Sequence, residues 1–152
     1  MPKAATSVDY EALAEFRYQI RKFLTFSQEA AREAGIDPQQ HQLLLAIRGL
    51  PEEVKPSIRT LAERLQIRHH SAVELIDRSV AHRLVQRQRD GTDRRQVTIH
   101  LTPKGDRLLS ELSIHHRDEL RNAGRELARV LRSIIAGSNA PLRSSARRSR
   151  ES

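Results

Sequence analysis

Residues 57–101 read SIRTLAERLQIRHHSAVELIDRSVAHRLVQRQRDGTDRRQVTIHL. In the first half of this stretch, apolar residues recur at helical spacing on both sides of residues 66–68, which predicts two short helices joined by a turn. In the second half, residues 85–89 and 96–101 have the spacing of β-strands, and residues 90–93 between them carry a turn signal. A helix-turn-helix followed directly by a hairpin predicts a winged helix.

Further helices are predicted on both sides of this stretch. Apolar residues at helical spacing run from Tyr10 to about Ala34, and a second helix follows the cap-and-proline pair at residues 37–38. A similar pair at residues 102–103 opens a long helix, which we expect to break or bend near residues 122–124 before a final helix. We therefore expect a mainly α fold with a small β-hairpin (α+β), in which N- and C-terminal helices flank a winged helix-turn-helix core.

Positive charge is concentrated in the winged helix and at the C-terminus. The chain of 152 residues has a formal net charge of +8. Residues 57–105 contain ten basic and five acidic residues, and residues 143–152 contain four and one, whereas the flanking helical segments are nearly balanced. A localised cationic face of this kind indicates a polyanionic partner. We expect that partner to be double-stranded DNA.

The composition excludes several other classes of protein. The sequence has no cysteine, which excludes disulfides, thiolate metal ligands and cysteine nucleophiles. No apolar run approaches the roughly 18 to 20 residues that span a bilayer, and residues 1–9 lack the apolar core of a signal peptide, so we expect a cytoplasmic protein without membrane contact. No Gly-x-Ser-x-Gly motif, P-loop or set of paired carboxylates occurs, so we expect no enzymatic activity and no cofactor.

The second helix of the helix-turn-helix, at about residues 69–82, is expected to enter the major groove, which is about 12 Å wide and admits one α-helix. Its exposed side carries the candidates for DNA contact, which are His69, His70, Ser71, Glu74 and Arg78. His70, Ser71 and Glu74 lie nearest the helix start and are the candidates for base contacts. Arg78 is expected to meet a phosphate or to pair with Asp77 or Glu74.

The hairpin, a wing at about residues 86–99, is richer in arginine than a structural turn requires. It carries Arg87, Arg89, Arg94 and Arg95. A thin β-ribbon can place an arginine in the narrow minor groove, where the negative potential is strongest. Asp93 could hold one of these arginines through a bidentate pair. We therefore count Asp93 and the four arginines among the candidate DNA-binding residues.

Five short motifs link these segments to a known family. They are LAERL, DR, LV followed by Arg87, DRR and LTPKG, at residues 61–65, 77–78, 84–87, 93–95 and 101–105. The most specific is Asp-x-Arg, five residues and then Leu-Thr-x-x-Gly, which the chain matches from Asp93 to Gly105. Over roughly residues 10–136 the chain resembles the MarR (multiple antibiotic resistance regulator) family of bacterial winged-helix regulators.

The resemblance implies a transcriptional regulator, in particular a repressor, that works as an obligate homodimer built from the first helix and the last two. It implies binding to an imperfect palindromic operator, with Arg94 or Arg95 as the minor-groove residue. It also implies release of DNA by a small effector, often phenolic or otherwise aromatic, that enters near the junction of the dimerisation and DNA-binding regions.

Three positions depart from the family pattern. Arg68 stands where a Ser or Thr commonly caps the recognition helix, so Ser71 or a histidine is expected to serve instead. Glu74 replaces a basic or polar residue, and its carboxylate could accept a hydrogen bond from cytosine N4. Arg83 replaces a glycine at the helix end, which demands a different cap geometry or a strained residue. At the preceding helix, either Ser57 or Thr60 can be the N-cap.

We expect one domain at residues 10–136, between a flexible N-terminus at residues 1–9 and a disordered basic tail at residues 137–152. Inside it we expect a DNA-binding core at about residues 37–102 and dimerisation helices at about residues 10–34 and 104–136. The terminal helices hold more apolar side chains than a core of this length can cover from within one chain. A two-fold dimer would bury them and set two recognition helices roughly 34 Å apart. The alternative is that these faces pack on each other within a monomer.

Two other interpretations compete with DNA binding. The pairs His69-His70 and His115-His116 raise zinc sensing, but adjacent helical residues point about 100° apart and no His-x-x-x-His occurs, so we expect no metal site. His115 or His116 could instead line an effector pocket or an interface. The more serious rival is a winged helix that docks a protein or RNA. Such modules often lack a basic wing, and RNA readers display aromatic residues, which make up 3% of this chain.

Overall fold

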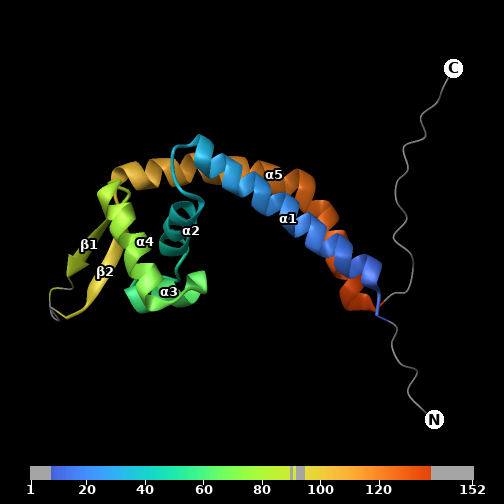
Figure 1. Cartoon of the computed structure of the whole chain (residues 1–152), viewed down its shortest axis with the longest axis horizontal. Helices are drawn as coiled ribbons and strands as arrows, with labels where there is room; N and C mark the ends of the chain where they lie inside the picture. The colour runs from blue at the N-terminus through green and yellow to red at the C-terminus, as the bar shows by residue number, and fades with distance from the viewer. Residues whose placement is uncertain (1–7, 90, 92–94, 138–152) are drawn as a thin grey trace, which may run out of the picture. The chain divides into compact units, whose positions relative to one another are not determined.

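The computed structural model describes residues 8–89, 91 and 95–137. Its helices are α1 (Tyr10–Glu33), α2 (Pro38–Arg48), α3 (Ile58–Leu65), α4 (His69–Ala81) and α5 (Pro103–Ala136), and its strands are β1 (Val85–Arg89) and β2 (Val97–Leu101) (Figure 1). The mainly α fold with a small hairpin is therefore confirmed. Across the described part of the chain, no helix has both the length and the apolar character needed to cross a membrane.

The chain divides into two compact units. The winged-helix unit comprises residues 25–118, which contain the end of α1, all elements from α2 to β2, and the start of α5. The helical-arm unit comprises, among the described residues, residues 8–24 and 119–137, which contain the first part of α1 and the last part of α5.

Helices α2 and α3 begin at caps that the sequence encodes. The Asp37 carboxylate accepts from the backbone N–H of Gln39 at 2.8 Å, and the Gln40 side chain accepts from the backbone N–H of Asp37 at 3.0 Å, which forms a capping box. Of the two candidates before α3, Ser57 is the N-cap, because its Oγ accepts from the backbone N–H of Thr60 at 3.2 Å.

The start of α4 differs from the expectation. Arg68 occupies the N-cap position, and no side-chain hydrogen bond caps this helix within the described chain. The expectation that Ser71 or a histidine would replace the missing cap is wrong. The reason is positional: an N-cap residue has extended backbone geometry outside the helix, whereas His69, His70 and Ser71 are already helical.

Helix α5 also differs from the expectation, because it continues without a break through residues 122–124. A single glycine inside a helix costs only about 1 kcal/mol relative to alanine. Gly124 lies among good helix formers such as Leu120 and Leu127, and no proline follows it within the helix. The composition of the surrounding helix therefore outweighs the local breaker signal, and the expected final two helices are one.

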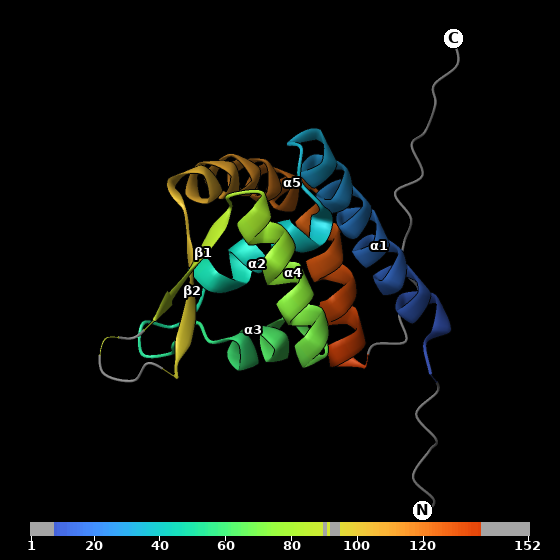
Figure 2. The same ribbon diagram turned by 60° about the vertical axis from the view of Figure 1, so that its left-hand side comes forward.

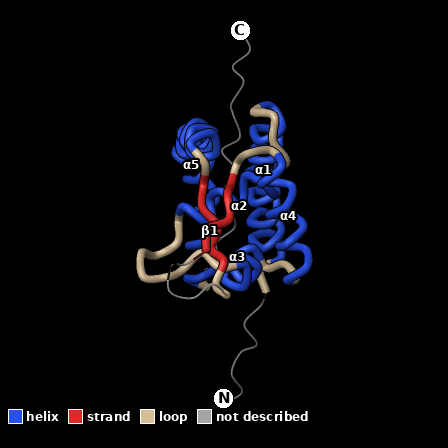
Figure 3. The backbone as a smooth tube through the Cα atoms, turned by 90° about the vertical axis from the view of Figure 1, so that its left-hand side faces the viewer, coloured by secondary structure: helices blue, strands red, loops and turns tan. Residues whose placement is uncertain are grey.

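The core of the winged-helix unit is one cluster of buried apolar side chains to which every element of the unit contributes. Its members are Ala31, Ile36, Leu43, Leu44, Leu61, Leu75, Ile76, Leu84, Val85, Ile99, Leu109 and Leu112. The strands lie side by side beside the helices of the unit (Figures 2 and 3). They pair antiparallel, with Val85 opposite Leu101. The backbone N–H of Ile99 donates to the carbonyl of Pro56 at 2.9 Å, which attaches β2 to the loop before α3.

Candidate nucleic-acid interface

Helix α4 turns one side to the core and the other to solvent. Ala72, Leu75, Ile76 and Ser79 are buried, and the Ser79 hydroxyl is satisfied by donating to the carbonyl of Leu75 at 2.8 Å. At 100° per residue, the positions opposite this buried stripe are 70, 74, 77, 78 and 81. The structure therefore places the predicted contact residues on an accessible helix face: His69, His70, Glu74 and Arg78 are exposed, and Ser71 is half-buried.

Arg78 is held by the start of α2. Its guanidinium donates to Oε1 of Gln39 at 3.2 Å and lies 4.0 Å from Oδ2 of Asp37. The expected pairing of Arg78 with Asp77 or Glu74 on its own helix is wrong. Asp77 diverges from Arg78 by about 100° around the helix, whereas Glu74, four positions away, lies on the same side but is not its partner among the described residues. The Arg78 side chain stays 45% exposed, so it remains able to meet a phosphate.

Asp77 pairs instead with Arg87, and this ion pair connects α4 to β1. Both side chains are substantially exposed, at 57% for Asp77 and 37% for Arg87. An exposed ion pair contributes little to the free energy of folding, about 0 to 1 kcal/mol. Its effect here is on orientation, because it joins the predicted recognition helix to an arginine of the predicted wing.

The hairpin is fixed along its inner strand and open along its outer one. In β2, Ile99 is buried, and Thr98 forms an isolated bridge with Ser57. In β1, every residue after Val85 is exposed, which includes Arg87 and Arg89. Arg95 is exposed as well. Asp93 and Arg94 lie outside the described residues, so the predicted bidentate role of Asp93 remains a prediction.

The end of α4 is held by the start of α5. The chain leaves α4 through Arg83, which has a left-handed φ of 58°, and the backbone N–H of Leu84 donates to the carbonyl of Ser79 at 2.9 Å. This is the common Schellman helix end, so the cap geometry is the usual one and Arg83 is the strained residue of the two expected alternatives. Thr102 Oγ1 donates to the carbonyl of Leu84 at 3.1 Å, and Lys104 Nζ donates to the carbonyl of His82 at 3.0 Å.

Gly105 makes this junction possible. A Cβ at position 105 would lie 2.1 Å from the carbonyl oxygen of Leu84, so only glycine fits. His82 is tied to α2 as well. Gln40 uses its Oε1 to accept from Asp37, so its Nε2 donates to His82 Nδ1 at 2.9 Å. The LTPKG motif was visible in the sequence, but nothing in the sequence indicated that its members would hold the end of α4.

Two histidines meet inside the winged-helix unit. The rings of His41 and His116 lie 4.7 Å apart, and His116 also contacts Phe26 edge-on at 5.4 Å. His116 Nδ1 donates to the carbonyl of Leu112 at 2.6 Å, and its Nε2 lies 2.8 Å from Ser27 Oγ. Burial and the neighbouring His116 lower the pKa of His41 from 6.5 to about 4. His116 was a candidate from the sequence, whereas no pattern in the sequence pointed to His41.

His116 is thus a half-buried packing residue, whereas His115 is exposed. Within the described ranges, no three His, Cys, Asp or Glu side chains are grouped closely enough to hold a metal ion.

A model of the MarR family matches residues 34–96, which run from the end of α1 into the wing. The chain is also 29% identical over 121 residues to YsmB of Bacillus subtilis (strain 168), an uncharacterised HTH-type transcriptional regulator. That match covers 77% of this chain and 81% of YsmB.

Three solved structures share the fold. AbsC, a MarR family transcriptional regulator from Streptomyces coelicolor, gives a TM-score of 0.66 at 18% identity, covering 88% of this chain and 96% of AbsC. A variant of S. aureus MepR bound to an oligodeoxyribonucleotide gives 0.61 at 18% identity, covering 86% and 98%. Bordetella bronchiseptica BpsR, whose DNA binding is regulated by 6-hydroxynicotinic acid, gives 0.51 at 21% identity, covering 82% and 83%.

Proposed function

This chain belongs to the MarR family of DNA-binding HTH transcriptional regulators, which are not enzymes, and from that premise we propose that it acts as a homodimeric repressor in the cytoplasm. Each subunit places α4 in the major groove of an imperfect palindrome and its wing in the adjacent minor groove. A small-molecule effector releases the DNA. The DNA-binding core is at about residues 37–102, and the dimerisation helices are at about residues 10–34 and 104–136.

The observation that carries this proposal is the ion pair between Asp77 of α4 and Arg87 of β1. It joins two exposed elements whose widths suit neighbouring grooves, since an α-helix fits the major groove and a ribbon can reach the minor one. His70, Ser71 and Glu74 at the start of α4 are the candidates for base contacts. Arg78, Arg89 and Arg95 supply further cations, and Asp93 and Arg94 directly precede Arg95 in the sequence.

The homodimer is supported by the helical-arm unit. Its large apolar side chains that remain exposed are Val8, Tyr10, Leu13, Tyr18, Leu24, Leu120, Leu131 and Ile135. Ile135 is 76% exposed and Tyr10 is 77% exposed. Each such side chain would gain about 1.5 to 3 kcal/mol if it were fully buried, so a second copy of the chain is the natural cover. A two-fold axis would also repeat α4 at roughly one DNA turn, about 34 Å away.

The effector is supported by a relative and by the family resemblance. BpsR shares the fold, and 6-hydroxynicotinic acid regulates its DNA binding. A ligand weakens DNA binding only if it prefers the conformation that does not fit the operator.

Fluorescence anisotropy with a duplex from the gene's own upstream region tests the proposal, beside a single-stranded RNA of equal length. We expect nanomolar to submicromolar binding to the duplex that weakens steeply with salt. Replacing Arg94→Ala with Arg95→Ala should weaken binding and flatten the salt dependence while the dimer stays intact. The matched control, Arg117→Ala with Arg121→Ala on α5, also removes two charges and should leave DNA binding unchanged. Preference for the RNA would overturn the proposal.

Base recognition needs a separate experiment. We expect Glu74→Gln to change which sequences are selected from a random duplex pool, because one base contact contributes about 1 to 3 kcal/mol of discrimination. The salt dependence should not fall, since Glu74 carries no charge that binds phosphate. An unchanged selected sequence would remove Glu74 from the base-reading set.

A further inference from the structure

The first residues of α2 lie beside the second half of α4. The Arg78 guanidinium donates to Oε1 of Gln39 at 3.2 Å. One helical turn further along α4, Nε2 of Gln40 donates to Nδ1 of His82 at 2.9 Å. Gln40 is only 1% exposed, so little water competes for its amide. Two neighbouring residues of α2 are therefore attached to two positions that are one turn apart on α4.

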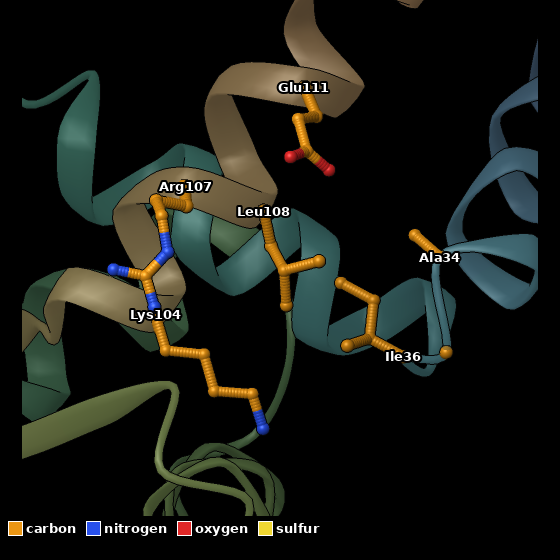
Figure 4. Close-up of a pocket in the computed structure, with 7 residues that line it drawn as sticks. Ala34, Ile36, Lys104, Arg107, Leu108 and Glu111 are labelled. Atoms are coloured by element: carbon orange, nitrogen blue, oxygen red, sulfur yellow. The ribbon is translucent and has the colours of Figure 1, made fainter.

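The end of α4 is held from α5 as well. Lys104 Nζ donates to the carbonyl of His82 at 3.0 Å. Figure 4 shows the Lys104 side chain extending from the start of α5 beside a cavity of about 270 Å³, which Ile36 and Arg107 also line. Because the end of α4 has partners on both α2 and α5, its position relative to the start of α2 is well defined.

The wing and the start of α2 flank α4 on different sides. Asp77 pairs with Arg87 of β1, whereas Arg78 pairs with Gln39 of α2. Since Asp77 and Arg78 point about 100° apart around the helix, their partners approach α4 from different directions. A helix in the major groove has one sugar-phosphate backbone on each side of it. With the wing on one side, the start of α2 is placed to meet the backbone on the other.

Gln39 offers a hydrogen-bond donor at this place. Its side chain is exposed, and its Oε1 accepts from Arg78, so the two N–H groups on its Nε2 point away from the guanidinium. In the part of the chain that the structure describes, this Nε2 donates to no other group. The backbone N–H of Gln39 already donates to the Asp37 carboxylate at 2.8 Å. The side-chain amide is therefore the group of Gln39 that remains available to a partner.

We propose that Gln39 donates its side-chain amide to a DNA phosphate beside Arg78, on the backbone that lies across α4 from the wing. The inference rests on the proposed function, because it requires α4 in the major groove. Side-chain amides and arginines commonly donate to phosphate oxygens, and such contacts fix the register of a protein on the duplex without reading its sequence. The Asp37 carboxylate lies 4.0 Å from the guanidinium and offsets part of its charge, so the contact depends more on hydrogen-bond donors than on net charge.

Two substitutions separate a phosphate contact from a purely structural role of Gln39. Gln39→Ala removes both the acceptor for Arg78 and the amide donor. Gln39→Glu keeps an acceptor for Arg78, removes the donor and adds a negative charge. Gln39 is exposed in the first turn of α2, where a glutamate is favourable, so both variants should fold.

Fluorescence anisotropy of the full chain, with the duplex from the gene's own upstream region, measures the effect. We expect Gln39→Ala to weaken binding about three- to tenfold, and Gln39→Glu to weaken it further, because its carboxylate repels the phosphate. The salt dependence of Gln39→Ala should equal that of the unaltered chain, since no charge is removed. The control is Gln28→Glu at an exposed glutamine of α1, which adds the same charge and should change binding less than about twofold.

Duplexes with one neutral methylphosphonate at a time then locate the contact. In each half of the operator, one such substitution should weaken binding by the unaltered chain and have a smaller effect on Gln39→Ala. Three results would overturn the contact alone: unchanged binding by Gln39→Ala, binding by Gln39→Glu at least as tight as by Gln39→Ala, or a methylphosphonate pattern that Gln39→Ala leaves unchanged. Failure of the unaltered chain to bind the duplex would overturn the proposed function, and this contact with it.

Discussion

The two units of this chain bury their apolar side chains in different ways. In the winged-helix unit, twelve apolar side chains from every element form one closed cluster. In the helical-arm unit, Ala12 and Val130 are fully buried, while eight large apolar side chains of the described residues remain exposed. The winged-helix unit buries its core with its own residues, whereas the helical-arm unit leaves an apolar surface exposed. The difference teaches that the apolar side chains that form the closed core and most of those left exposed are encoded in separate segments.

The largest expected effect is a loss of stability at Gly105, in the winged-helix unit. Gly105→Ala would place a methyl group 2.1 Å from the backbone oxygen of Leu84, which cannot move aside as a flexible side chain can. We expect the free energy of unfolding to fall by about 3 kcal/mol or more, measured by urea denaturation. The control is Gly124→Ala in the middle of α5, where the nearest side-chain atoms are 3.8 Å from the added Cβ and a gain of up to about 1 kcal/mol is expected. Equal stability of the two variants would contradict the tight junction.

The second effect is a pH dependence that belongs to the same unit. The pKa of the His41 ring falls from its ordinary value of 6.5, taken for the unfolded chain, to about 4 in the folded chain. Between these two pH values, the unfolded chain therefore binds a proton that the folded chain does not bind. The contribution of His41 to stability is therefore complete above about pH 6.5 and is lost as the pH falls to about 4, by roughly 3 kcal/mol at most. His116 is the ionisable ring that faces His41, and Phe26 and Ser27 contact His116.

Urea denaturation of the unaltered chain and of His41→Gln over this pH range isolates the effect. The difference between the two profiles should grow toward higher pH and level off above pH 6.5. A difference that does not change with pH would contradict the lowered pKa of His41, which an NMR titration of the ring measures independently.

The third effect concerns the helical-arm unit. Ile135→Glu places a charge on the exposed apolar surface and should weaken dimerisation by about 2 kcal/mol per copy, because the burial of one isoleucine is lost. Size-exclusion chromatography with light scattering should show a shift toward the monomer. Leu45→Glu, an equally drastic change at an exposed leucine of the winged-helix unit, should leave the dimer intact. A dimer that survives the first change and dissociates with the second would reverse the assignment of the two units.

The smallest effect returns to the end of α4. Arg83 adopts a left-handed backbone conformation that costs an ordinary L-residue roughly 1 kcal/mol. Arg83→Gly should remove this strain and raise the free energy of unfolding by up to about 1 kcal/mol in thermal or urea denaturation. Destabilisation instead would show that the Arg83 side chain contributes more than the strain costs.

Local signals predicted most of the fold. The caps at Asp37 and Ser57, the helix-turn-helix and the hairpin all follow from spacing and from capping chemistry that act within a few residues. Of the predicted break or bend near Gly124, the break was wrong, because one weak breaker was given more weight than the long helical stretch around it. The cap of α4 was wrong because the candidate side chains lie inside the helix.

The candidate site was predicted less completely. The exposed face of α4 and the cationic hairpin follow from periodicity, but the partners of their charges do not. Arg78 pairs with Gln39 at the start of α2, which lies 39 residues earlier in the sequence. Arg87 pairs with Asp77 of α4. The same holds for the cavity lined by Ile36 and Arg107, which are far apart in the sequence. Contacts of this kind depend on how the elements pack, and no local pattern in one sequence encodes them.

The ion pair between Arg87 and Asp77 also bears on how the free protein meets DNA that lacks its operator. A cation that is already compensated attracts arbitrary duplex less strongly, so fewer counterions are displaced at decoy sites. Nonspecific sites outnumber an operator by about a millionfold or more in a genome. Weaker binding to them therefore shortens the time that the protein needs to find its operator. Where the rest of the surface fits the DNA, Arg87 can exchange the Asp77 carboxylate for a phosphate. The ion pair with Asp77 then reduces nonspecific DNA binding more than operator binding.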